Sequence, residues 1–265
     1  MKNLVIVRGG GDIATGTIYK LYKSGFKVLV LEISNPSAIR RHVAFSEAVY
    51  EGFQKVEDVT CYLANDIEQA QSMLDEGKLV MLVDENGNSI DKLKPEVVVD
   101  GILAKKNLGT TIDMAPITIA LGPGFEAKKD VDVVIETKRG HNLGRIIEQG
   151  CAYPNSGIPG IIKGFGKERV IHSPADGTLY NINKIGDIVK KGDVIATIGK
   201  VNVEASMDGL LRGLIRNGYP VTKGFKIADI DPRLEEYDNC FTISDKARCI
   251  AGGVLEAILY LKGKL

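Results

Sequence analysis

Residues 4–16, LVIVRGGGDIATG, decide how the first part of this chain folds. An apolar run ends in three glycines, which is typical of a buried strand that turns directly into a helix. Gly9, Gly11 and Ala14 fit the pattern G-x-G-x-x-G/A. In that pattern the first glycine makes a tight turn, the second lets a phosphate approach the backbone, and the small third residue lets helix pack on strand. The stretch therefore predicts a strand, a glycine turn and a helix of the dinucleotide-binding type.

A second apolar run, residues 27–33, carries Glu32 at its tip, 21 residues after Gly11. Dinucleotide-binding folds place a carboxylate at about this distance, where it accepts hydrogen bonds from ribose hydroxyls. The helix between the two runs is predicted over residues 13–23 and is closed by Gly25. The arrangement is β-α-β.

The turn itself carries two charges. Arg8 enters it and Asp12 stands at the helix cap, where a plain dinucleotide loop would be nearly featureless. The N–H groups of the helix start at Ile13 and the positive end of its dipole favour an anion, whereas Asp12 can also simply cap the helix. The sequence allows a nucleotide-like ligand, or a Rossmann-like loop that binds nothing.

Strand and helix signals continue to alternate after this unit. A helix is predicted over residues 66–76. Short apolar runs typical of buried parallel strands follow it, which predicts an open, mostly parallel sheet and an α/β fold; these runs are residues 79–83, 97–100, 117–121 and 131–136.

A different architecture begins near Val170, where one segment is repeated. PADGTLYNINKIGDIVKKGDVIATI starts at Pro174, and SMDGLLRGLIRNGYPVTKGFKIADI starts at Ser206, 32 residues later, without a gap between the aligned copies. So many shared positions indicate an internal duplication. Each copy is rich in β signals but too small to bury its own apolar face. We therefore expect the two copies to fold as one interlocked unit.

The run GDIVKKGDVIATI, residues 186–198, resembles the half-motif of biotinyl and lipoyl domains. Two such halves interlock in a barrel-sandwich hybrid, and a lysine at the hairpin tip carries the cofactor. The equivalent tip here has Glu204, Ala205, Ser206 and Met207 and no lysine among them. The resemblance implies a barrel-sandwich hybrid-like module for structure or docking, with no covalent biotin or lipoate.

The chain returns to helix at its end. Ser244 is a good N-cap for an apolar stripe that begins at Ala247. The pair Gly252-Gly253 within it indicates close helix packing or a kink. We expect a Rossmann-like α/β domain over residues 1–168, a duplicated β module over residues 169–233, and a C-terminal helical segment over residues 234–265 that packs back on the α/β body.

Two later strand ends carry further candidate ligand groups. Gly122 and Gly124 form a second glycine turn in LGPGF, and Arg139 and His141 follow the next strand in ETKRGHNLGR. Open α/β sheets bind ligands beyond the carboxyl ends of their strands, where Arg139 and His141 can hold an anion. Turns with solvated charges are the alternative. His141 has no evident titratable partner, so the sequence identifies no catalytic residue.

Two other polar groups follow strands. Arg40, Arg41 and His42 either reach a ligand phosphate or are exposed helix charges. Asp100 ends a predicted strand, where it either faces a cleft or caps a helix.

Composition excludes several classes of function. The chain has 34 basic and 34 acidic residues, with no Lys/Arg run longer than two, so we expect no nucleic-acid partner. Its four cysteines form no C-x-x-C pair and, with three histidines, no metal-ligand spacing, which indicates reduced thiols in a cytoplasmic protein without a metal site. Neither a Walker lysine nor a G-x-S-x-G elbow is present.

We also expect no targeting or membrane segment. Residues 1–3 lead directly into the first strand, which leaves no room for a signal-peptide core. The longest apolar stretch, residues 249–261, contains Glu256 and falls short of the roughly 20 residues that span a bilayer.

Segments along nearly the whole chain resemble the YqeB family of selenium-dependent molybdenum hydroxylase accessory proteins: VRGGGDIATG, IRRHVAFSEAVYEG, VVVDGILAK, ALGPGF, VIETKRGHNLGR, PNSGIPG and ISDKARCIAGGVLEAIL. That family is related through its Rossmann-like domain to XdhC, which protects molybdenum cofactor and delivers it to xanthine dehydrogenase. The resemblance implies a maturation factor whose partner is a molybdenum hydroxylase of the xanthine dehydrogenase type. The step concerned would be selenium insertion, or cofactor sulfuration or transfer.

The resemblance also implies a ligand, either molybdenum cofactor or a nucleotide. In this interpretation Gly9, Gly10, Gly11 and Asp12 cradle its phosphate and Arg8 neutralises the charge, while the loop with Arg139 and His141 closes over the ring system. One alternative is an NAD(P)-dependent oxidoreductase, for which the sequence shows no proton donor. The other is a non-catalytic interaction protein that docks a partner through the duplicated β module. A homo-oligomer is a further possible partner, and the sequence does not fix the oligomeric state.

Overall fold

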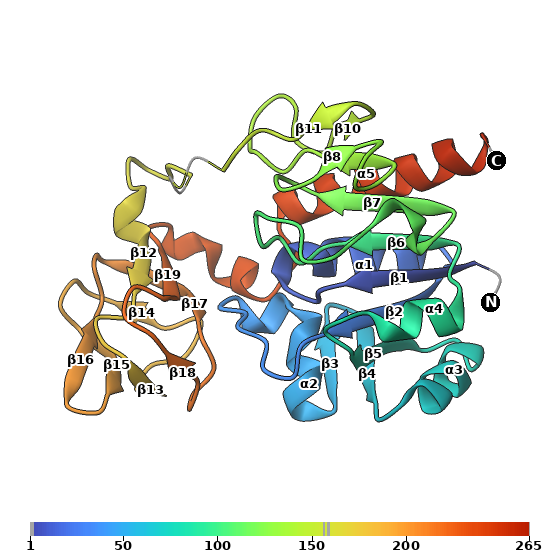
Figure 1. Ribbon diagram of the computed structural model, residues 1–265. Coiled ribbons are helices and arrows are strands. Elements are labelled where there is room, and N and C mark those ends of the chain that lie inside the picture. The colour runs from blue at the N-terminus through green and yellow to red at the C-terminus, as the bar shows by residue number, and fades with distance from the viewer. Residues whose placement is uncertain (1–2, 156, 158–159, 265) are drawn as a thin grey trace. The chain divides into compact units, whose positions relative to one another are not determined.

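The computed structural model describes residues 3–155, 157 and 160–264 (Figure 1). Met1 and Lys2, which lead into the first strand, lie outside these ranges. So do Ser156, Ile158 and Pro159 of the PNSGIPG motif.

The chain forms two compact units. The sheet unit comprises Met1–Pro36, Ala44–Asn155 and Ile243–Leu265, and the duplicated unit comprises Ser37–Val43 and Ser156–Thr242. The duplicated unit extends beyond the expected residues 169–233. It includes Cys240, which is buried in its core, and Ile39, whose carbonyl accepts a hydrogen bond of 2.8 Å from Leu214 N–H.

A sheet of nine strands forms the centre of the sheet unit, in the order β10-β9-β7-β6-β1-β2-β5-β4-β3. The strands pair in parallel except for the two edges, β3 and β10, so the mostly parallel sheet and the α/β class are confirmed. The bounds are β1 Leu4–Arg8, β2 Lys27–Glu32, β3 Phe53–Val56, β4 Val59–Ala64, β5 Leu79–Val83, β6 Val97–Asp100, β7 Ile117–Leu121, β9 Val133–Ile135 and β10 Ile146–Ile147; a separate pair joins β8 Glu126–Ala127 and β11 Gly150–Cys151.

The helices of the sheet unit cover this sheet. The α-helices are α1 Asp12–Lys23, α2 Ala48–Glu51, α3 Ile67–Asp75, α4 Asn88–Leu93 and α5 Asp245–Lys262, with short 3-10 turns at Phe45–Glu47 and Ile112–Met114. The central strands β1 and β6 are buried along their whole length, as expected for parallel strands with both faces covered. No helix among the described residues is long and apolar enough to cross a bilayer.

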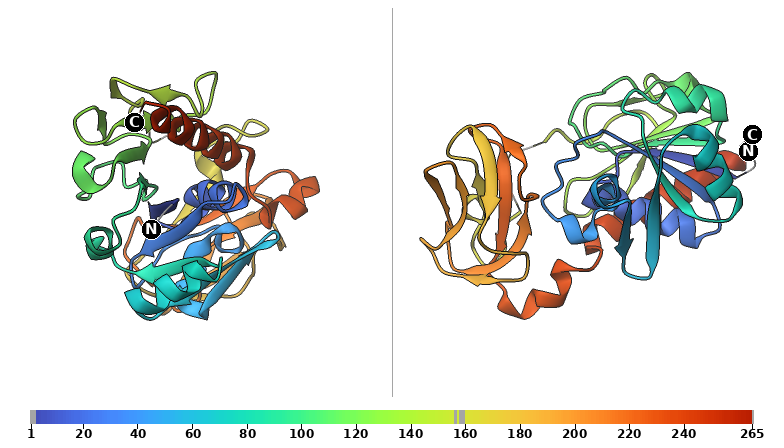
Figure 2. Two further views of the ribbon diagram at one scale, coloured as in Figure 1. Left: turned by 90° about the vertical axis from the view of Figure 1, so that its right-hand side faces the viewer. Right: turned by 90° about the horizontal axis from the view of Figure 1, so that it is seen from below.

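The C-terminal helix α5 packs beside α1, as Figures 1 and 2 show. A Cβ at Gly16 of α1 would lie 2.7 Å from the Ala247 carbonyl oxygen, so only glycine allows this approach. A Cβ at Gly253 would lie even closer to the Gly144 carbonyl oxygen, which explains one of the two glycines in the helix. Ser244 caps α5 by accepting a hydrogen bond of 3.2 Å from Ala247 N–H, as its sequence predicted.

The duplicated unit is built from two four-stranded sheets, ordered β12-β19-β17-β14 and β16-β15-β13-β18. The two sheets are related by the 32-residue repeat. Each strand of the first sheet lies 32 residues before or after the strand that takes the same place in the second sheet. Each sheet thus takes strands from both copies, which interlock as predicted: β14 pairs with β17, and β18 pairs with β13. The bounds are β12 Val170–His172, β13 Gly177–Asn181, β14 Ile188–Val189, β15 Val194–Ile198, β16 Val201–Glu204, β17 Gly209–Leu214, β18 Pro220–Val221 and β19 Lys226–Asp231.

Turn contacts repeat with the same symmetry. Asp208 accepts a hydrogen bond of 2.7 Å from Lys191 N–H, and Asp176 accepts one of 2.7 Å from Lys223 N–H. At the predicted hairpin tip, Ala205 and Met207 are buried in the core, and the Ser206 hydroxyl donates to the Glu168 carbonyl.

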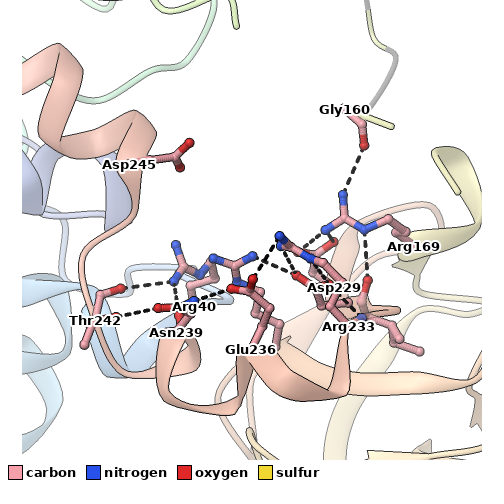
Figure 3. Close-up of polar contacts among 12 residues, drawn as sticks. Arg40, Gly160, Arg169, Asp229, Arg233, Glu236, Asn239, Thr242 and Asp245 are labelled. Atoms are coloured by element: carbon pink, nitrogen blue, oxygen red, sulfur yellow. Dashed lines mark hydrogen bonds and ion pairs between the residues drawn. The ribbon is translucent and has the colours of Figure 1, made fainter. Parts of the chain in front are cut away.

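A network of arginines and carboxylates lies on β19 and the segments packed against it (Figure 3). Asp231, whose side chain is 0% exposed, accepts hydrogen bonds of 2.8 Å from both Arg212 and Arg233. Arg169 donates to the Ile230 carbonyl at 3.1 Å and forms an ion pair of 3.4 Å with Asp229. These charges are buried in pairs, which is the condition under which buried ions are tolerated.

Candidate functional site: the glycine loop

The glycine loop, residues 9–11, lies at a switch point of the nine-stranded sheet. β1 pairs with β2 on one side and with β6 on the other, both in parallel. The chain therefore leaves β1 toward one half of the sheet and later returns to build the other half. Open α/β sheets bind ligands outside the carboxyl ends of their strands at such points.

Two of the three glycines are required by the fold itself. Gly9 has a φ of +89°, in the left-handed region, and a Cβ there would lie 2.9 Å from Ile102 Cα. A Cβ at Gly10 would lie 2.8 Å from Met81 Cε and 3.1 Å from Ser46 N. The packing of neighbouring segments against the loop therefore accounts for both glycines.

Gly11 is different. Its φ of −64° and ψ of 176° suit any residue, and a Cβ there would meet no heavy atom within 4 Å. It is the N-cap of α1, whose first N–H groups have no partner within the helix. Gly11 has no side chain to accept from them. The packing of the described residues gives no reason for a glycine at this position.

Glu32 closes one side of the loop from the end of β2, so the structure brings it to the loop as its spacing suggested. Its Oε2 accepts a hydrogen bond of 2.7 Å from Gly10 N–H, and its Oε1 accepts one of 2.9 Å from Ile33 N–H. Burial raises the pKa of Glu32, and these two bonds act against the rise. Because the carboxylate holds Gly10 N–H, a phosphate cannot use that donor, and the expected contribution of Gly10 to a phosphate cradle does not fit this arrangement.

Arg8 also departs from its expected role. It is 3% exposed, and its guanidinium donates at 2.5 Å to the Thr110 hydroxyl, which in turn donates at 2.5 Å to Asp100. Further bonds run to the carbonyls of Glu85 and Leu108. Burial raises the pKa of Asp100, against the Thr110 bond. Arg8 thus connects the loops beneath the site through hydrogen bonds, and its charge does not face a surface ligand.

Lys246 is the cation near the site that sequence reasoning missed. It lies in the first turn of α5, where burial and then the charge of Arg139 lower its pKa, while Asp12, Glu136 and Asp245 act in the opposite direction. Its electrostatic interaction with Asp12 links it to the first residue of α1. The packing of α1 on α5, with the close contact of Gly16 and Ala247, brings these helix starts together, and the sequence around Lys246 alone does not predict it.

The structure brings Arg139 to this region but not into the role expected for it. The Arg139 guanidinium forms a two-pronged ion pair with Asp245, at 2.8 and 3.0 Å, and is 54% exposed. His141 lies exposed in the following turn. Asp12 and Ile13, the first two residues of α1, are half-buried at the open side of the loop.

Gly122 and Gly124 serve the packing of loops. Gly122 has a φ of +77°, and a Cβ there would lie 2.5 Å from the Thr137 hydroxyl. Gly124 has a φ of +110°, and a Cβ there would lie 2.7 Å from the Lys106 backbone. Both glycines therefore have structural reasons to be present.

Residues 40–42 belong to the duplicated unit. Arg40 donates to the carbonyls of Asn239 and Thr242 at 3.1 and 3.4 Å (Figure 3), and Arg41 donates to the Leu214 carbonyl at 2.8 Å. His42 packs against the Phe241 ring. Holding the duplicated unit together accounts for these side chains.

No group of histidine, cysteine or acidic side chains within the described ranges is arranged to hold a metal ion. All four cysteines are free thiols; Cys61 and Cys240 are buried, and Cys151 and Cys249 are exposed.

Comparison with known proteins gives one close relative. The chain is 52% identical over 259 residues to the Escherichia coli (strain K12) protein described as "Uncharacterized protein YqeB". The match covers 97% of this chain and 48% of the relative, so the chain spans about half the length of the curated protein it matches. No family model matches the chain.

Solved structures resemble the chain only distantly. An aspartoacylase family protein from Mesorhizobium loti aligns at 12% identity over 86% of this chain and 84% of that one, with a TM-score of 0.30. The apo ectoine utilization protein EutE from Ruegeria pomeroyi aligns at 12% identity over 85% of each chain, with a TM-score of 0.25. Likeness at this level carries no argument about function.

Proposed function

The chain belongs to the YqeB family, and on that premise we propose that its sheet unit binds a phosphate-bearing cofactor or nucleotide at the N-terminus of α1. The observation that carries the proposal is the open space at Gly11. The other two residues of the loop, Gly9 and Gly10, are glycines because protein atoms crowd them, whereas no atom of the described residues lies within 4 Å of a Cβ at Gly11. A ligand that approaches the backbone supplies the missing reason.

The charges around the loop favour a phosphate on the side of residues 11–13. Glu32 blocks Gly10 N–H, so the donors that remain are those at the start of α1. Lys246 supplies the cation that Arg8, buried beneath the loop, does not. Each Glu32 oxygen keeps a second lone pair and can accept from a ligand hydroxyl. A phosphate next to a hydroxyl-bearing group is the chemistry of a nucleotide or a phosphorylated pterin.

The test is to fill the space at Gly11. We expect Gly11→Val to fold normally, because its backbone angles suit any residue, and to lose ligand affinity about tenfold to hundredfold, the scale of one charge-assisted hydrogen bond of about 1.5–3 kcal/mol. Calorimetry with molybdopterin, its nucleotide forms and NAD measures the affinity and separates cofactor binding from an NAD(P)-dependent oxidoreductase.

Gly11→Ser serves as the matched control for stability, since serine is a preferred N-cap and should keep or raise the melting temperature. Binding of the true ligand by Gly11→Val at wild-type affinity would remove the loop from the site.

From the family resemblance we infer a role for the whole protein, the maturation of a molybdenum hydroxylase of the xanthine dehydrogenase type. We expect a host that lacks the protein to make hydroxylase polypeptide in normal amount but with low activity. The defect should lie in cofactor content or in the sulfur or selenium ligand. Immunoblotting, activity assay and metal and selenium analysis measure the three quantities. Full hydroxylase activity in the deletion strain under selenium-replete growth would end this inference.

For the duplicated unit we propose a barrel-sandwich hybrid that docks a partner. Its support is the exchange of strands between the copies, together with the burial of Ala205 and Met207 where a carrier domain would expose its lysine. If the protein only docks a partner and binds no ligand at the glycine loop, calorimetry with these ligands should show no binding heat. The Gly11 experiment therefore also distinguishes ligand binding from a docking role alone.

A further inference from the structure

A pocket of about 320 Å³ lies in the sheet unit at the ends of β9, β10 and β11, within the loop that carries ETKRGHNLGR. Arg145, Cys151 and Tyr153 line it, and Ile147 and Ala152 add apolar walls. Its volume is at the lower end of the range for small-molecule sites, about 300–1,000 Å³. The space suits a metabolite of modest size and not a dinucleotide.

The floor of this pocket is fixed. Glu136 is 2% exposed, and its two oxygens accept hydrogen bonds from Tyr153 N–H at 2.9 Å and Lys138 N–H at 2.7 Å. The Lys138 ammonium also lies 4.8 Å from the centre of the Tyr153 ring. These contacts hold the Tyr153 backbone in place, so the wall is formed before any ligand binds.

The guanidinium of Arg145 is the charged group of this pocket that is available to a ligand. Among the described residues, no hydrogen bond or ion pair engages its guanidinium. By contrast, Arg139 in the same loop is bound to Asp245. A guanidinium binds a carboxylate or phosphate through two parallel N–H donors, and an apolar wall beside it accommodates the rest of such a molecule.

We propose that this pocket is a second ligand site, which binds a small organic anion with its carboxylate or phosphate on Arg145 and its apolar part against Tyr153. The exposed Cys151 thiol lines the same pocket and reports its occupancy. The site uses none of the groups at the glycine loop, so the two proposals can fail separately.

The first test compares alkylation of the intact protein by iodoacetate, an anion, and by iodoacetamide, its neutral analogue. The ratio of the two rates cancels the intrinsic reactivity of each thiol. Cys249 is the internal control, because it is exposed, donates to the Leu143 carbonyl and lies outside the pocket. We expect the ratio to be about fivefold higher at Cys151 than at Cys249, the effect of about 1 kcal/mol of ion pairing.

Arg145→Gln should abolish this preference without loss of stability, since the guanidinium forms no hydrogen bond or ion pair with any residue that the structure describes. Lys129→Gln is the matched control: Lys129 interacts electrostatically with Cys151 but is already paired with Glu126 at 3.0 Å, so the preference should remain. The proposal would be overturned if the ratio of rates were the same at the two cysteines, or if Arg145→Gln and Lys129→Gln reduced the preference of Cys151 for iodoacetate equally.

The second test measures protection of Cys151 from iodoacetamide by benzoate, phenyl phosphate and neutral benzyl alcohol. Protection by benzoate alone supports a carboxylate ligand, and protection by phenyl phosphate alone or by both anions supports a site open to phosphate esters. Protection by neither anion, or equal protection by benzyl alcohol, overturns the anion site.

Discussion

Cutting the duplicated unit between its two copies should leave neither half folded. The first copy supplies β12 and β14 to one sheet and β13 and β15 to the other, and the second copy supplies the remaining strands. A half cut at Gly199 therefore keeps two strands of each sheet, and a two-stranded piece without a covered apolar face is marginal at best in water. The buried residues of each copy, such as Leu179 and Leu211, would be exposed.

The measurement is amide hydrogen exchange on residues 160–242 and on each half expressed separately. We expect protected amides in the whole segment, none in the halves, and recovery of protection when the halves are mixed. A protected core in an isolated half would contradict the interlocked pairing. Mass spectrometry of the same samples tests the tip, since covalent biotin or lipoate would show that it serves as a carrier.

Asp231→Asn should destabilise the duplicated unit by about 3 kcal/mol. Removing one partner of a buried pair costs about 3–5 kcal/mol, because the other charge stays buried without compensation. Arg212 depends on Asp231 in this way: its side chain is 14% exposed, and its Nε has no partner among the described residues. Arg233 is more exposed and also contacts Glu236, which places the effect at the lower end of the range.

Chemical denaturation followed by a probe within the duplicated unit measures this loss. Asp208→Asn is the matched control, since Asp208 is an exposed turn carboxylate that accepts from Lys191 N–H, a bond worth about 0.5–1.5 kcal/mol. Equal losses in the two variants would show that the burial of Asp231 adds nothing.

The same variant should change the response to acid. Burial acts to raise the pKa of Asp231, but the hydrogen bonds and charge of Arg233, with the charge of Arg212, hold that pKa at about 2. Because the unfolded carboxyl titrates near about 3.9, its contribution to stability is complete above that pH and is lost as the pH falls toward about 2. The wild type should therefore lose stability between these values more steeply than Asp231→Asn.

Features that depend on short stretches of sequence could be predicted. The strand, glycine turn and helix of residues 4–23, the buried parallel strands and the cap at Ser244 follow from local apolar patterns and turn chemistry. The duplication could be predicted as well, because the two copies share identical residues at a constant spacing of 32 positions. The hairpin β3–β4 was missed, since its alternation is weak and one of its ends, Phe53, is exposed.

The roles of charged residues could not be predicted in the same way. Arg8 was expected to face a phosphate but binds Thr110, a partner 102 residues away in the sequence. Lys246 reaches the site because α5 packs on α1. The pair Gly252-Gly253 indicated close packing of this helix, but neither segment alone identifies the other as its partner. Glu32 was placed at the loop correctly, yet its bond to Gly10 N–H depends on backbone geometry that no spacing rule contains.

The packing of α1 on α5 has a consequence for the order of synthesis. The ribosome makes α1 before the duplicated unit, but the residues that cover Gly16 appear only after that whole unit has been translated. Because translation proceeds at about 5–20 residues per second, the face of α1 that α5 later covers stays exposed for roughly ten seconds or more. During that time the nascent sheet unit holds its glycine loop without the helix that carries Lys246. The growing chain, and not the finished one, is where we expect chaperones and proteases to compete for this protein.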